Sequence, residues 1–254
     1  MKFIKRCAKG FCMSLGMFWV VPLPFHIWDD ASMDLMLPLF PVIGILIGAV
    51  WWGIGSLLVL SVVHVVLAAA VLMTVPFWLT GFLHLDGYMD TSDAVLSRRP
   101  LEDKLKILKD PNTGAFAVIM LGFLFVLQFG AVYVIVDEGK ALLLLVFIAV
   151  VSRCMGSISL MCMKIMPESG YANMMTQNIR AGHRGFVIAL LLASGIIAYF
   201  ITGINGLIVI GAVVLGYIGA MAYARKEFKG VSGDLTGFSL VVGELCGLLA
   251  LAVV

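Results

Sequence analysis

The sequence predicts an all-α, polytopic membrane protein, one helix bundle over residues 1–254. Hydrophobic residues make up 62% of the chain and charged residues only 13%, whereas a soluble domain usually keeps about a quarter of its residues charged. The mean hydropathy is +1.09. Seven apolar stretches meet or approach the about twenty residues that a bilayer core requires: 37–59, 60–82, 115–136, 141–163, 186–202, 206–224 and 235–254. We therefore expect about seven transmembrane helices.

The first apolar segment, residues 11–27, differs from these seven. It is short and contains Pro22 and Pro24, which would break a spanning helix. We expect an N-terminal half-helix or re-entrant segment here. The N-terminus as a whole, a basic head followed by an apolar stretch, imitates a signal peptide, but no small-residue cleavage site follows, so we expect it to be retained.

Lysine and arginine predict the orientation of the helices, because short cytoplasmic loops are enriched in them. The connectors at 137–140 and near 203–205 hold just one basic residue, Lys140. Apart from Arg153, the other basic residues cluster at the N-terminus and at 98–109, 164–184 and 225–229. This distribution predicts a multi-pass protein of the cell (inner) membrane in which 37–59 and 60–82 form a hairpin. Its cytoplasmic, catalytic loops then lie near 84–114, 164–185 and 225–237.

Charge and cysteine usage exclude other classes of protein. The net charge is only +2, and no basic run is interleaved with aromatic residues, so we expect no nucleic-acid partner. The five cysteines are scattered and form no CxxC pair, which argues against a disulfide framework.

The run GFLHLDGYMDTSDAVLSRRP places three aspartates at the end of an apolar stretch. With a helix repeat of about 100° per residue, Asp86, Asp90 and Asp93 fall at about 0°, 40° and −20°, on one stripe. Each would cost about 2.5–3.5 kcal/mol at membrane depth. Oxygen ligands without thiols favour Mg²⁺, so we expect these three to bind it. Alternatively, they cap a helix and face water.

Basic residues follow the aspartates and could neutralise a pyrophosphate held by the metal: Arg98, Arg99, Lys104, Lys106 and Lys109. Positive-inside markers are the alternative for the two arginines. Residues 100–110 predict a short amphipathic helix on the membrane surface. Asp110 and the turn Pro111-Asn112-Thr113-Gly114 then give a loop that could fold over the acidic site.

His84 is a candidate general base, because its ordinary pKa suits that role. On a continuous helix, however, it lies about 160° from Asp86. It reaches the site only if the backbone bends near Gly81 or Gly87. With Asp93 and Asp110, His84 completes our set of candidate catalytic residues.

Two charges lie inside apolar stretches. Arg153 is about 16 Å from the interfacial Lys164 along a helix, and Glu244 about 15 Å from Asp234. They either neutralise each other or serve the substrate. In the second case Arg153 holds a substrate phosphate, and Asp234 or Glu244 supports the metal or positions a hydroxyl.

Five motifs in order carry a family resemblance. The run His84-Leu85-Asp86-Gly87-x-x-Asp90-Thr91-x-Asp93 closely resembles the HLDGLADTxDG signature of the cobalamin-5′-phosphate synthase, or adenosylcobinamide-GDP ribazoletransferase, family. The further matches are Phe40-Pro41-Val42-Ile43-Gly44, Lys109-Asp110 with Gly114, Ser152-Arg153, and Gly230-x-Ser232-Gly233-Asp234-x-x-Gly237. Ala94 and Pro111 depart from the pattern, which usually has glycine and serine there.

The resemblance implies a membrane enzyme that joins adenosylcobinamide-GDP to α-ribazole, or its 5′-phosphate, and releases GMP. The residues themselves already indicate Mg²⁺ as cofactor and contact with membrane lipid, and the oligomeric state stays open, a homo-oligomer included. Two other classes are considered. A CDP-alcohol phosphotransferase has a D-G-x-x-A-R pattern that Thr91-Ser92 does not match. A carboxylate-lined transporter predicts acids near the bilayer midplane and some repeat symmetry.

Overall fold

The apolar stretches fold as helices, as predicted. We describe a computed structural model, which covers residues 2–20, 22, 24 and 27–254. Over these residues the chain contains eleven α-helices and one 3₁₀ helix, and the only strand-like pairing is an isolated bridge between Ile165 and Val231. The all-α prediction is therefore confirmed.

Six helical segments in this part of the chain are long and apolar enough to cross a membrane, which makes the chain a multi-pass membrane protein. They are Asp30–Leu60 (η1, Asp30–Leu35, with α2, Met36–Leu60), α6 (Ala115–Asp137), α7 (Leu144–Cys162), α9 (Ala181–Thr202), α10 (Ile204–Phe228) and α11 (Gly233–Val253). The remaining helices are α1 (Lys2–Phe18), α3 (Val65–Leu79), α4 (Leu83–Leu96), α5 (Leu101–Ile107) and α8 (Gly170–Thr176).

The span expected over 60–82 is instead a shorter helix that ends in a sharp bend. Helix α3 has 15 residues, and α4 leaves it at 92°. Gly81 and Phe82 both adopt the left-handed conformation, with φ of 58° and 63°, which ends a right-handed helix. If α3 and α4 are counted as one broken span, the number of candidate spans among the described residues rises to seven.

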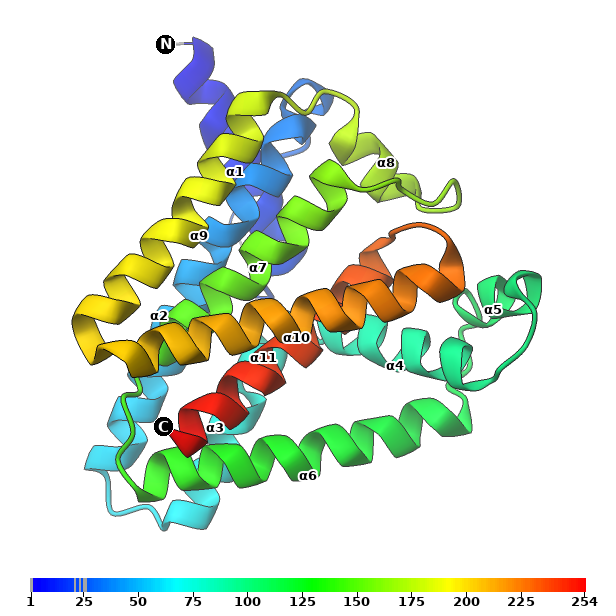
Figure 1. Ribbon diagram of the computed structural model, residues 1–254. Helices are drawn as coiled ribbons and strands as arrows, with labels where there is room; N and C mark the ends of the chain where they lie inside the picture. The colour runs from blue at the N-terminus through cyan, green and yellow to red at the C-terminus, as the bar shows by residue number, and fades with distance from the viewer. Residues whose placement is uncertain (1, 21, 23, 25–26) are drawn as a thin grey trace.

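Helices α7 and α11 lie at the centre of the bundle. Helix α11 packs against α10, α4, α7 and α6, and α7 packs against α2 and α9 (Figure 1). Of the most apolar 18-residue stretch of each helix, 83% is buried in α7 and only 17% in α9. Side chains on α7 therefore contact protein, and most of α9 faces outward.

The N-terminal segment is an amphipathic helix rather than a span. Helix α1 packs beside α2 and η1. Arg6 Nη2 lies 2.7 Å from Asp34 Oδ1, and Lys9 Nζ lies 3.1 Å from Asp29 Oδ2. The basic head thus neutralises the acidic turn that follows. The part of the expected half-helix at residues 21, 23 and 25–26 lies outside the described residues.

Candidate functional site

The polar loops that the sequence singled out meet on one side of the bundle. Met166 N donates to Val231 O at 2.9 Å, and Val231 N donates to Lys164 O at 3.0 Å. Buried Lys104 forms an ion pair with Glu227 at the end of α10. These contacts gather α4, α5, α8 and the turn between α10 and α11 at the right of Figure 1.

Helix α4 is held directly against the start of α11 through two glycines. A Cβ added at Gly87 would lie 2.8 Å from Asp234 O, and one at Gly237 would lie 3.2 Å from His84 O. Such close backbone approach requires residues without side chains, as is common between membrane helices. The contact places Asp234 of α11 beside the aspartates of α4.

The three predicted aspartates lie on one helix, α4, as their spacing indicated. Asp86 is exposed, and Asp90, Asp93 and Asp234 are partly buried. The carboxylates of Asp86, Asp234 and Asp93 are all near enough to Asp90 to repel a negative charge there. The opposite face of α4, including Tyr88, is buried. The result is an acidic face made of four aspartates from two helices.

This acidic face has the donor chemistry for a hard cation. In the described part of the chain, no three His, Cys, Asp or Glu side chains converge so that they could together hold a metal ion. The structure thus does not assemble Asp86, Asp90 and Asp93 into a ready-made three-ligand site. Mg²⁺ usually takes only one or two protein carboxylates and completes its shell with water and substrate phosphate. The carboxylates around Asp90 fit that smaller requirement.

The loop at 110–114 folds over the acidic face, as the sequence suggested. A Cβ at Gly114 would overlap the Asp93 carboxylate. The Asp110 carboxylate accepts hydrogen bonds from Asn112 N at 2.9 Å and from Asn112 Nδ2 at 2.8 Å. These bonds hold the pKa of Asp110 below its ordinary value. In the structure Asp110 therefore shapes the loop, and its catalytic role stays a prediction.

The basic residues that follow the aspartates, between residues 98 and 109, include some with and some without an ion pair in the part of the chain that the structure describes. Arg98, Arg99 and Lys109 are exposed and form no ion pair with any described residue. Lys104 is only 6% exposed and is paired with Glu227, so the expectation that it faces a pyrophosphate is wrong.

Helix α5 also differs from the expectation of a helix lying on lipid. Its apolar residues Leu101, Leu105 and Leu108 pack into the same cluster as Leu85 and Phe228. The short helix is thus attached to the protein, next to α4 and the end of α10.

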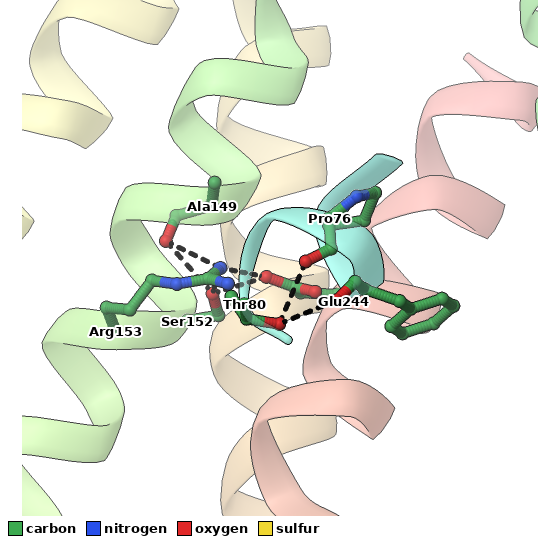
Figure 2. A network of polar contacts seen from close by, with 7 residues as sticks. Pro76, Thr80, Ala149, Ser152, Arg153 and Glu244 are labelled. Atoms are coloured by element: carbon green, nitrogen blue, oxygen red, sulfur yellow. Dashed lines mark hydrogen bonds and ion pairs between the residues drawn. The ribbon is translucent and has the colours of Figure 1, made fainter. Parts of the chain in front are cut away.

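Arg153 and Glu244 form an ion pair in the interior (Figure 2). Arg153 Nη1 also donates to Ala149 O at 3.1 Å and Ser152 Oγ at 3.0 Å, and Ser152 Oγ donates to Glu244 Oε1 at 2.9 Å. Arg153 is 1% exposed and Glu244 5%. Mutual neutralisation, one of the two alternatives, is the arrangement present. A role for Arg153 or Glu244 in binding substrate stays a prediction.

His84 faces a cavity rather than the aspartate stripe. The bend at Gly81 places it in the first turn of α4, where it is 7% exposed. It lines a cavity of about 280 Å³ together with Asp234. His84 therefore meets the acidic face through this cavity, and its role as a base stays a prediction.

Sequence reasoning missed the walls of the cavity. They come from the end of α1, α2, α7 and α8. Helix α8, with Tyr171, Ala172 and Met175, carries no motif that could have indicated this position. The signals were Phe40 and Gly233, which belong to two of the five motifs and line the cavity, and the expected catalytic loop at 164–185, which contains α8.

Fold and site together define the class: a multi-pass α-helical membrane protein whose acidic face adjoins an apolar cavity at one side of the bundle. Sequence motifs that lie apart along the chain therefore meet in this site. The motif from His84 to Asp93 contains the aspartates of α4, and Lys109-Asp110 with Gly114 forms the loop over them.

The chain belongs to the cobalamin-5-phosphate synthase family, because a family model of that description matches residues 10–252. A relative named adenosylcobinamide-GDP ribazoletransferase from Clostridium botulinum (strain Alaska E43 / Type E3) is 38% identical over 97% of this chain and 98% of its own. One of the same name from Clostridium perfringens (strain SM101 / Type A) is 37% identical over 99% of this chain and all of its own (100%). One from Geobacillus kaustophilus (strain HTA426) is 29% identical over 95% and 94%. No solved structure matches significantly.

Proposed function

We propose that this protein is an adenosylcobinamide-GDP ribazoletransferase. It joins adenosylcobinamide-GDP to α-ribazole, or α-ribazole 5′-phosphate, and forms adenosylcobalamin or its 5′-phosphate. Full-length relatives of that name support this activity, and neither the CDP-alcohol phosphotransferase nor the transporter is favoured. The observation that carries the proposal is the clustering of Asp86, Asp93 and Asp234 around Asp90.

The reaction exchanges one phosphorus–oxygen bond for another. The 3′-hydroxyl oxygen of the ribazole bonds to the phosphorus that carries the corrinoid's aminopropanol arm. The bond from this phosphorus to the bridging oxygen breaks, GMP leaves, and the hydroxyl proton passes to a base. Such transfers leave the protein mainly with positioning and charge stabilisation.

One or two of Asp86, Asp90 and Asp93 would hold Mg²⁺, which when bound neutralises charge on the phosphate oxygens. Arg98, Arg99 and Lys109, the free basic residues near this face, would bind the remaining pyrophosphate oxygens. His84 and Asp93 are the candidates to accept the hydroxyl proton, and the loop containing Asp110 would cover the reacting groups.

The acidic face is proposed to lie on the cytoplasmic side of the cell membrane. Support comes from the basic residues of the loops that meet there, including Arg99, Lys164 and Arg225, because basic residues are enriched on that side. The connector at the other end of α6 contains Asp137 and Glu138 with one lysine, Lys140.

The test is GMP release by purified protein given adenosylcobinamide-GDP, α-ribazole 5′-phosphate and Mg²⁺. Asp90→Asn should abolish release, and EDTA should do the same to the wild type. Asp137→Asn makes the same chemical change at an exposed aspartate ending α6 and should leave turnover unchanged. Undiminished activity in Asp90→Asn would contradict the assignment of the site, and activity that survives EDTA would contradict the metal.

A further inference from the structure

The cavity beside the acidic face is largely apolar and partly aromatic. Its walls include Phe18, Phe40, Leu160, Ala172 and Met175. The Phe18 and Phe40 rings lie 4.3 Å apart between centroids. The His84 ring stacks on Phe18 at 11° and 6.3 Å. Flat aromatic groups are favourable ligands for such walls, because offset stacking adds to the burial of apolar surface.

One buried polar atom in this wall has no partner. His84 is 7% exposed, and its Nδ1 forms no hydrogen bond within the part of the chain that the structure describes. A buried polar atom without a partner is unfavourable. Nδ1 has almost no surface on the cavity as the ring is placed, so a ligand with a ring nitrogen becomes its partner when the imidazole turns about its Cβ–Cγ bond, a rotation that exchanges the ring nitrogens with ring carbons.

The size of the cavity limits what enters it. About 280 Å³ is just below the about 300–1,000 Å³ of common small-molecule pockets. It accommodates one aromatic ring system and excludes a corrinoid macrocycle. Asp234 lines the cavity and also belongs to the acidic face, so a group attached to the ring system would extend toward the aspartates of α4.

Guanine is the second aromatic base among the substrates, and the cavity suits it poorly. Its amide and amino edge needs several hydrogen-bonding partners, and polar groups buried without them are costly. Five of the fifteen lining residues are polar, and two of these are engaged elsewhere: Thr236 donates to Ser232 O at 2.8 Å, and Asp234 belongs to the acidic face. The walls therefore favour a base with fewer polar groups.

We propose that this cavity binds the aromatic base of the ribazole substrate, with His84 Nδ1 bonded to a ring nitrogen and the ribose directed past Asp234 to the acidic face. This assignment rests on the proposed function and adds to it the position of one substrate. His84 is then a substrate-binding residue that selects a flat, weakly polar base.

Filling the cavity tests the assignment. Ala172 is 3% exposed and lines it, so Ala172→Leu should raise the KM for α-ribazole 5′-phosphate by about tenfold or more, the effect of about 1.4 kcal/mol. The KM for adenosylcobinamide-GDP should not change. Ala222→Leu adds the same volume at an exposed position of α10 and should alter neither value. A rise for adenosylcobinamide-GDP alone would place guanine in the cavity and overturn the proposal, as would no rise at all.

A second pair of variants tests His84 independently of cavity volume. His84→Leu should weaken binding of α-ribazole 5′-phosphate, whereas His84→Asn, which keeps a polar atom near the position of Nδ1, should retain most of it. Equilibrium dialysis with radiolabelled α-ribazole 5′-phosphate, without the second substrate or metal, measures this binding directly. Equal binding by both variants, or none by the wild type, would overturn the proposal. GMP release by the wild type separately decides the proposed function.

Discussion

Replacing Glu244 by glutamine should destabilise the protein strongly, because it leaves the buried charge of Arg153 without its counter-ion. Arg153 is 1% exposed, and its remaining partners for Nη1 are two neutral oxygens, Ala149 O and Ser152 Oγ. Removing one member of a buried ion pair costs about 3–5 kcal/mol. At about 2–4 °C per kcal/mol for a chain of this size, the expected fall in Tm is about 6–20 °C.

The assay is thermal unfolding of the purified protein in detergent. Glu138→Gln is the matched control, since Glu138 pairs with Lys140 at 3.0 Å with its side chain 56% exposed. Loss of this surface pair should lower Tm by less than about 4 °C. The double variant Arg153→Met with Glu244→Leu should recover most of the loss, because an apolar pair can replace a buried ion pair. If Glu244→Gln keeps its Tm but loses turnover, the pair serves the substrate and our reasoning is refuted.

Three further predictions concern the loops around the acidic face. Gly114→Leu should lower turnover by at least about tenfold, or 1.4 kcal/mol in the barrier, because its side chain would overlap Asp93; an unchanged kcat would show that the loop adapts freely. Lys104→Met should lower kcat/KM without unfolding the bundle, because it releases α5 from Glu227, and limited proteolysis should then cut the 97–114 loop faster. In Asp110→Ala the loop loses a carboxylate whose pKa lies below the ordinary 3.8. At pH 7 the wild type should therefore resist proteolysis better than Asp110→Ala. The difference between the two should disappear as the pH falls below about 3.8, because only the charged form of the Asp110 carboxylate is stabilised by folding.

Local spacing was enough to predict the helix that carries the aspartates. Asp86, Asp90 and Asp93 repeat at i, i+4 and i+7, and any regular helix places such residues on one face. The short helix α5 was predicted for the same reason, from Pro100 and the leucines that follow. In both cases the information lies within a few turns of the chain.

Contacts between distant segments could not be predicted in this way. Lys104 pairs with Glu227, 123 residues along the chain, and no local pattern separates it from its exposed neighbour Lys106. The leucine stripe of α5 fits lipid and protein equally well, because both are apolar. The bend was only partly predictable: Gly81 was one of two positions considered for it, but the left-handed conformation of Phe82 is unusual for a residue other than glycine.

The right-angled turn between α3 and α4 has a consequence for how large molecules reach the protein. Where α3 runs along the bilayer normal, the 92° bend directs α4 parallel to the membrane surface. The successive carboxylates along α4 then lie at nearly the same depth in the membrane. A wide molecule resting on the headgroups can engage them sideways, without being drawn down between the helices.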